Sequence, residues 1–118
     1  LTKRFTSKEE RRRVVACIYD PSRVDSPRVG FENHLNYVHA GGNGLDMLLA
    51  KGLWAYLNST ALDQYFRQFN GHTQVNATDL RNVRFPTAYQ LRAIGSQIGD
   101  MGLEQDDVDE IVTREVKA

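Results

Sequence analysis

The side chains best suited to chemistry are gathered in residues 67–86, a polar stretch that follows an apolar helical pattern and precedes another. Arginine, glutamine and asparagine can make paired hydrogen bonds to base edges, whereas threonine and backbone N–H groups suit phosphates. The same residue types also cap and turn a chain, so composition alone leaves both readings open. The candidate DNA-facing residues are Arg67, Gln68, His72, Thr73, Gln74, Asn76, Arg81 and Arg84.

Residue spacing gives little support to other chemistries. The histidines His34, His39 and His72 form no HExxH pattern and have no cysteine partner, which argues against a metal site. No GxSxG nucleophile motif is present, so no catalytic residue is predicted. The GGNG segment at 41–44 lacks the Lys-Ser/Thr of a phosphate loop, and a plain strand-to-helix turn explains it better than an anion site at a helix N-terminus.

Strands are expected first along the chain. Residues 13–19 are rich in β-branched and aromatic side chains, and residues 29–40 alternate apolar and polar positions. The two strands could pair antiparallel. Cys17 lies between apolar neighbours and is interpreted as a buried small hydrophobe rather than a nucleophile.

Helices are expected after residue 44. Apolar spacing predicts one helix over 45–57, capped by Asn43, and a second over 62–69 that ends at Asn70-Gly71. Thr87 and Gln90 have the spacing of a capping box that starts another helix, and residues 103–116 form an acidic amphipathic pattern. The large apolar residues of this region are assigned to the core: Leu48, Trp54, Tyr65, Phe66 and Phe69.

Much of the stretch 71–86 has structural tasks of its own. Gly71 lets the chain leave a helix, and the side chains of Asn76, Thr78 and Asp79 can bond the backbone locally. Leu80, Val83 and Phe85 are expected to re-enter the core, with a short strand at about 83–85 that Pro86 closes. The predicted fold class is therefore α+β: a small mixed domain with a few N-terminal strands followed by packed helices.

Size and composition set the remaining bounds. A chain of 118 residues with 41% hydrophobic and 25% charged residues is expected to form a single domain, residues 1–118. No apolar run is long enough for a membrane helix, and a single cysteine permits no disulfide framework, so a cytoplasmic location is favoured.

Charge is unevenly distributed although the net charge is zero. Residues 1–40 carry 8 Lys/Arg against 5 Asp/Glu, residues 41–99 carry 5 against 3, and residues 100–118 carry 2 against 7. A mildly basic body can face phosphate. A basic run such as KEERRR at 8–13 can equally well be a solvated surface.

The segment NSTALDQYFRQFNGHTQVNATDLRNVRFP, residues 58–86, resembles part of the C-terminal specificity region of adenine-specific (N6) DNA methyltransferases from restriction–modification systems. The resemblance is strong over residues 53–86 and weaker over FENHLNYVHAGGNGL upstream. Asn70 and Val83 stand where the family has Ser and Leu, and both changes keep the chemical character.

The resemblance implies a target-recognition region that binds double-stranded DNA beside a catalytic domain of the same parent chain. That catalytic domain would bind S-adenosylmethionine and use an Asx-Pro-Pro-aromatic tetrapeptide, which is absent here because Pro21, Pro27 and Pro86 are isolated. The chain by itself is therefore expected to need no cofactor and to catalyse no methyl transfer. A first residue other than Met agrees with a fragment of a longer methyltransferase.

A second hypothesis is a protein-interaction module without DNA contact of its own. Its motivation is the acidic C-terminal helix, whose Val108, Ile111 and Val112 could dock on another domain or subunit. An acidic helix would repel DNA, so on either hypothesis it should lie away from a duplex.

Overall fold

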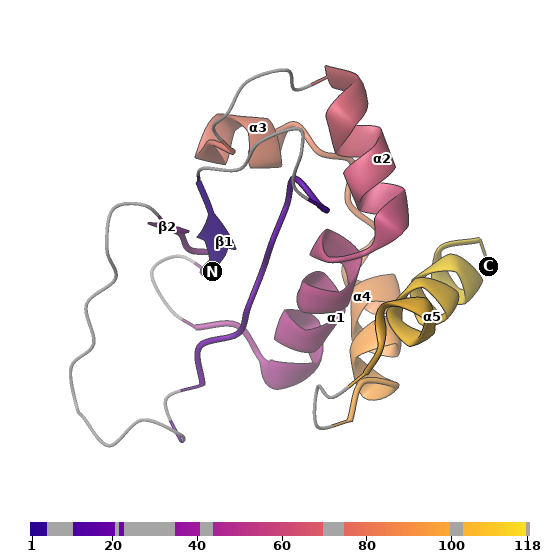
Figure 1. Cartoon of the computed structure of the whole chain (residues 1–118). Helices are drawn as coiled ribbons and strands as arrows, with labels where there is room; N and C mark the ends of the chain where they lie inside the picture. The colour runs from indigo at the N-terminus through magenta and orange to yellow at the C-terminus, as the bar shows by residue number, and fades with distance from the viewer. Residues whose placement is uncertain are drawn as a thin grey trace.

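The chain folds into a small α+β structure, as predicted from the sequence. The computed structural model describes residues 1–4, 11–20, 22, 35–40, 44–69, 75–99 and 103–117. Two short strands lie to one side of most of the helices, and one short helix lies above the strands (Figure 1). The elements are β1 (Thr2–Lys3), β2 (Leu35–Asn36), α1 (Met47–Leu57), α2 (Thr60–Phe69), α3 (Ala77–Arg81), α4 (Ala88–Ser96) and α5 (Gln105–Lys117).

Strand β1 lies between two segments from elsewhere in the chain. It pairs antiparallel with β2, with Thr2 opposite Asn36, and Thr2 also forms a bridge to Ala16 on its other side. The bridge is held by Lys3 N–H donating to the Val15 carbonyl at 3.1 Å. The chain's first residues thus occupy the middle of the small sheet.

In the part of the chain that the structure describes, the predicted strands are much shorter than expected and do not pair with each other. Within residues 13–19 only Ala16 takes part in a bridge, and within 29–40 only Leu35–Asn36 is a strand, while 29–34 lie outside the described residues. The reason is that β1 lies between the two segments. Cys17 is exposed, so its predicted burial is wrong.

Helices α1 and α4 cross at two glycines. A Cβ built on Gly52 would lie 1.8 Å from the Leu91 carbonyl oxygen, and one on Gly95 would lie 1.9 Å from that of Leu48. Such close contact with the backbone of the other helix is possible only because Gly52 and Gly95 carry no side chain. The N-cap of α1 is Asp46 rather than the predicted Asn43: its carboxylate accepts from Leu49 N–H at 2.9 Å and from Arg92 of α4 at 2.8 Å.

Among the residues that the structure describes, two apolar clusters form the core. One joins the N-terminal segment to α2 and α3, and the other joins α1, α4 and α5. The first contains Val14, Leu57, Leu62, Phe66, Val75, Leu80 and Val83, and the second contains Ala55, Ile94, Ile98, Val108 and Val112. Helix α5 therefore turns its apolar stripe toward this chain's own core.

Three residues predicted to be core are not. Leu48, Tyr65 and Phe85 are 46%, 39% and 39% exposed, and the side chain of Phe69 lies outside the described residues. Helix α1 is apolar except for Lys51, so some of its apolar side chains, such as Leu48, must face outward. Residues 83–85 form no strand because no described segment pairs with them, and the Phe85 ring instead lies 5.9 Å from that of Tyr56.

The glycine crossing gives a first prediction. Helix propensity alone would make Gly52→Ala stabilising by about 1 kcal/mol, but the added methyl must push α1 and α4 apart. We expect a net loss of about 1–3 kcal/mol in the free energy of unfolding, measured in urea. Gly99→Ala is the control, since its Cβ would meet nothing within 4 Å. Equal stability of the two variants would contradict the crossing.

Candidate nucleic-acid interface

The corner between α1 and α2 holds the N-terminal segment in place. Asn58 is 5% exposed, and its side-chain amide bonds both backbone groups of Ala16: Oδ1 accepts from Ala16 N–H and Nδ2 donates to its carbonyl, each at 3.0 Å. Asn58 Nδ2 also donates to the Trp54 carbonyl at 2.9 Å. The Asn58 side chain thus makes the two hydrogen bonds to Ala16 that a neighbouring strand would make. The same side chain also ends α1.

The next residues of the corner start α2. Ser59 Oγ accepts from Leu62 N–H at 3.2 Å, which makes Ser59 the cap of this helix. Thr60 donates to Asp109 of α5 through both its backbone N–H, at 2.8 Å, and its hydroxyl, at 2.6 Å. A carboxylate at a helix N-terminus is favourable because it meets the positive end of the helix dipole.

Asp63 orients the candidate Arg67. Asp63 is 8% exposed, its Oδ1 accepts from Arg13 N–H at 2.7 Å, and its Oδ2 accepts from Arg67 Nε at 2.9 Å. Arg13 is completely buried, with its guanidinium 5.8 Å from the centre of the Phe66 ring. The Arg67 guanidinium is therefore held in place by the buried carboxylate of Asp63 and remains partly exposed.

The described candidates lie on the last turns of α2, around α3 and just after it. Gln68, Arg81 and Arg84 are exposed, whereas Arg67 and Asn76 are half-buried. The C-terminal end of α2 and helix α3 lie at the same end of the molecule, away from the acidic helix α5 (Figure 1). His72, Thr73 and Gln74, predicted to face DNA, lie outside the described residues.

Two of the candidates also have structural contacts. Asn76 N–H donates to Asp79 Oδ2 at 3.0 Å at the start of α3, in agreement with the predicted local capping. The Arg84 carbonyl accepts from the Tyr56 hydroxyl at 2.8 Å, and burial raises the pKa of that hydroxyl above its ordinary value. The side chain of Arg84 itself points to an exposed surface.

The N-terminal segment contains Arg4, Arg12 and Arg13, which were not among the DNA-facing residues predicted from the sequence. The Arg4 carbonyl accepts from Val75 N–H, and Asn36 Nδ2 donates to the Val75 carbonyl at 2.7 Å, so the sheet is tied to the start of α3. Arg12 donates to the Asn58 carbonyl. The basic run at 8–13 is thus not uniformly solvated, because Arg12 is half-buried and Arg13 is buried. In the sequence, the only indication of these arginines was the basic run itself.

The acidic helix α5 is fixed to the opposite side of this corner. Val108 and Val112 are 3% and 1% exposed, so they do not form the outward docking surface proposed from the sequence. Gln105 donates to the Asn58 carbonyl at 2.9 Å and to Asp109 at 3.1 Å. Burial would raise the pKa of Asp109, but the hydrogen bonds from Thr60 and Gln105 hold it below the ordinary aspartate value.

Comparison with known proteins gives two relatives. The chain is 55% identical over 117 residues, 99% of its length, to the Type II methyltransferase M.PstI of Providencia stuartii. It is 54% identical over 98 residues, 83% of its length, to the Type II methyltransferase M.BsuBI of Bacillus subtilis. The chain is homologous to part of these Type II methyltransferases. It spans only 23% of the first and 20% of the second.

Other comparisons add little. No family model matches the chain, and no solved structure matches it. None of the described helices has the length and hydrophobicity that crossing a membrane requires. Within the described ranges, no group of three or more His, Cys, Asp or Glu side chains comes together as a metal site would need.

The role of Asn58 can be tested by substitution. Asn58→Ala leaves the N–H and carbonyl of Ala16 without their partners, and each unsatisfied group costs about 1–3 kcal/mol. We expect the free energy of unfolding to fall by about 2–4 kcal/mol in a urea titration. Asn82→Ala is the matched control, since Asn82 is exposed and ends α3 through its backbone N–H. A loss no larger than that of the control would refute the role.

The Asp109 contact predicts a pH dependence. A carboxyl group with a lowered folded pKa stabilises the fold fully above its unfolded pKa, about 3.9, and loses this contribution as pH falls through the folded value. Asp109→Asn should therefore lower Tm at neutral pH, and the difference from wild type should shrink toward about pH 2. Asp106→Asn, on the exposed side of α5, is the control. A difference independent of pH would exclude this explanation.

Proposed function

We propose that this chain is the DNA-binding target-recognition region of a site-specific adenine-N6 DNA methyltransferase of a restriction–modification system. The observation that carries the proposal is the 55% identity with the Type II methyltransferase M.PstI over 99% of the chain. The identity extends through residues 58–86, the segment whose pattern resembles the specificity region of adenine methyltransferases.

The distribution of charge supports a DNA-facing end. Gln68 of α2 and Arg81 of α3 are exposed, and Arg67 of α2 is half-buried. The C-terminal end of α2 and helix α3 lie at the same end of the molecule (Figure 1). The acidic residues of α5 lie on the other side of the molecule, where they would not repel a duplex. Arginine at such a surface can neutralise phosphate or bond guanine, and glutamine can bond adenine.

The roles of the individual candidates follow from their contacts. Arg81, Arg84 and Gln68 are proposed to touch DNA directly because their side chains are exposed. Arg67 is proposed to reach a phosphate or base from a fixed position, since Asp63 already orients its guanidinium. Asn76 is proposed to contact DNA together with His72, Thr73 and Gln74, which precede it in the sequence.

The rest of the reaction would belong to the parent enzyme. We propose that S-adenosylmethionine and the methyl-transfer chemistry reside in a catalytic domain of the same polypeptide, in the cytoplasm. The alternative of a docking module without DNA contact loses its motivation, because the apolar residues of α5 that suggested it lie in this chain's own core.

The test uses the complete parent methyltransferase and long duplex DNA of mixed sequence. Arg81→Ala should weaken binding several-fold and reduce the slope of log affinity against log salt by about 1, since one phosphate contact is lost. If Arg81 instead bonds a base, the loss should be about 1–3 kcal/mol at the cognate site alone.

The matched control is Arg114→Ala, which removes an exposed arginine from α5. It should leave DNA affinity and its salt dependence unchanged. Equal effects of the two variants, or no effect of Arg81→Ala, Gln68→Ala and Arg84→Ala, would contradict the proposed interface.

A further inference from the structure

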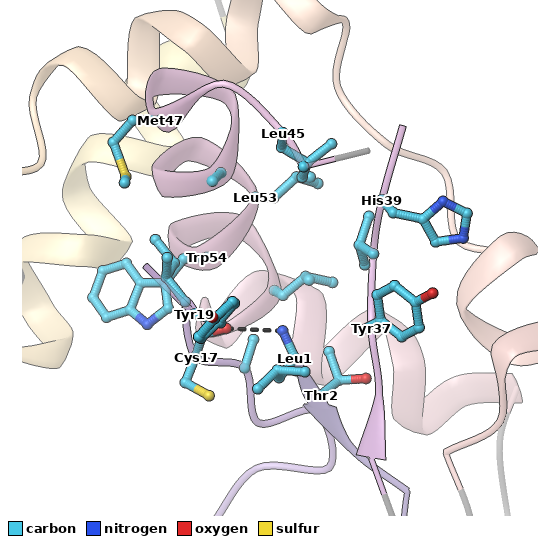
Figure 2. Close-up of a pocket in the computed structure, with 16 residues that line it drawn as sticks. Leu1, Thr2, Cys17, Tyr19, Tyr37, His39, Leu45, Met47, Leu53 and Trp54 are labelled. Atoms are coloured by element: carbon cyan, nitrogen blue, oxygen red, sulfur yellow. Dashed lines mark hydrogen bonds between the residues drawn. The ribbon is translucent and has the colours of Figure 1, made fainter. Parts of the chain in front are cut away.

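A cavity of about 390 Å³ lies where β1 begins. Figure 2 shows it between the start of the chain, the segment that carries Tyr37 and His39, and helix α1. Its walls include Cys17–Tyr19 on one side and Tyr37–His39 on the other, and Leu53 and Trp54 of α1 form its floor. It lies apart from the residues proposed to contact DNA.

The hydrogen-bond ladder leads directly into this cavity. Leu1 and Cys17 exchange both backbone bonds at 2.9 Å: Leu1 N donates to the Cys17 carbonyl, and Cys17 N–H donates to the Leu1 carbonyl. This is the hydrogen-bonded type of antiparallel pair, and pair types alternate along a ladder. A residue before Leu1 that continued the strand would therefore stand opposite Ile18 as a non-hydrogen-bonded pair.

The same extension is defined on the other side of β1. Thr2 stands opposite Asn36 and the strands are antiparallel, so the register places a residue before Leu1 opposite Val38. One before that would stand opposite His39 and, across the strand, Tyr19. The residues that line the two walls are those that a lengthened β1 would pair with, so the cavity has the position of one missing strand segment.

The exposure of the side chains around the cavity also agrees with a missing strand segment. Tyr37 and Val38 are 55% and 46% exposed, an unusual position for apolar side chains beside a sheet. Thr2 is 1% exposed and lines the cavity, yet its hydroxyl has no hydrogen-bond partner in the described part of the chain. A strand laid between the walls would cover Tyr37 and Val38, and its inward side chain would lie beside that of Thr2.

We propose that the polypeptide segment immediately preceding Leu1 in the parent methyltransferase continues β1 and fills this cavity. The proposal rests on the proposed function and adds that the catalytic part precedes this region in the same chain. The residue directly before Leu1 points inward, as Thr2 does, and is apolar. The one before it points outward, as exposed Lys3 does. The segment thereby joins the two parts of the enzyme through a shared sheet.

Disulfide formation in the full-length parent tests the register. With Cys17→Ser as background, cysteine is placed directly before Leu1 and at Ile18. Non-hydrogen-bonded antiparallel partners lie about 4.5 Å apart between Cα atoms, within the range that a disulfide accepts. Mild oxidation should join the two peptides nearly completely, as detected by mass spectrometry of the digested protein.

The control places the first cysteine one residue earlier, where its side chain would point to the opposite face of the strand. Little cross-linking is expected there. No cross-link in the first pair, or equal cross-linking in both, would overturn the proposal. Cross-links between two molecules would identify a second copy as the occupant instead, which also overturns it.

A second measurement does not depend on the double variant folding. Aspartate placed directly before Leu1 would bury a charge in the cavity and should lower Tm of the parent by several degrees. Aspartate one residue earlier should leave Tm nearly unchanged. Equal effects overturn the proposal. Neither measurement uses DNA, so a failed cross-link with intact DNA binding refutes the inference alone, and lost DNA binding with intact cross-linking refutes the proposed function alone.

Discussion

The arrangement of this molecule depends on the side-chain amide of Asn58. It joins the N-terminal segment to the helices by bonding both backbone groups of Ala16, and it ends α1 at the Trp54 carbonyl. The backbone carbonyl of Asn58 accepts from Arg12 and from Gln105 of α5. Segments from both ends of the chain therefore meet at one residue. Removing the side chain would leave the backbone groups of Ala16 without partners and loosen the N-terminal segment against the helices.

This dependence changes how residues 58–63 are understood. They belong to the segment that resembles methyltransferase specificity regions, yet Asn58, Ser59 and Asp63 are all buried. Their contacts fix the corner from which α2 leaves, and Asp63 then fixes Arg67. The polar side chains in this part of the segment hold α2 in its place. The exposed side chains that follow on α2 and α3 are available to bind a partner.

The sequence predicted the helices better than the strands, for physical reasons. Apolar periodicity and local caps determine a helix from within, and the predicted capping box is present, with Gln90 N–H donating to Thr87 Oγ1 at 3.1 Å. A strand depends on its partner. Here the partner is a two-residue strand at the start of the chain and the side chain of Asn58, which no alternating pattern could reveal.

The candidate site was predictable to a similar degree. The exposure of Gln68 and Arg81 agrees with their positions on amphipathic helices. The burial of Arg13 was not predictable, because it depends on Asp63 and Phe66, about fifty residues later in the chain. The exposure of Cys17, which pairs with Leu1 at the start of the chain, was likewise not predictable from its apolar neighbours.

The pairing of Asn58 with Ala16 also has a consequence for solubility. An uncovered sheet edge presents unpaired N–H and carbonyl groups that recruit strands from other molecules and lead to aggregation. Proteins commonly protect such edges with charged residues, prolines or bulges. Here one primary amide, which donates and accepts as a peptide group does, occupies the outward-facing groups of the edge residue. A single side chain thereby blocks the intermolecular β-pairing that this edge would otherwise permit.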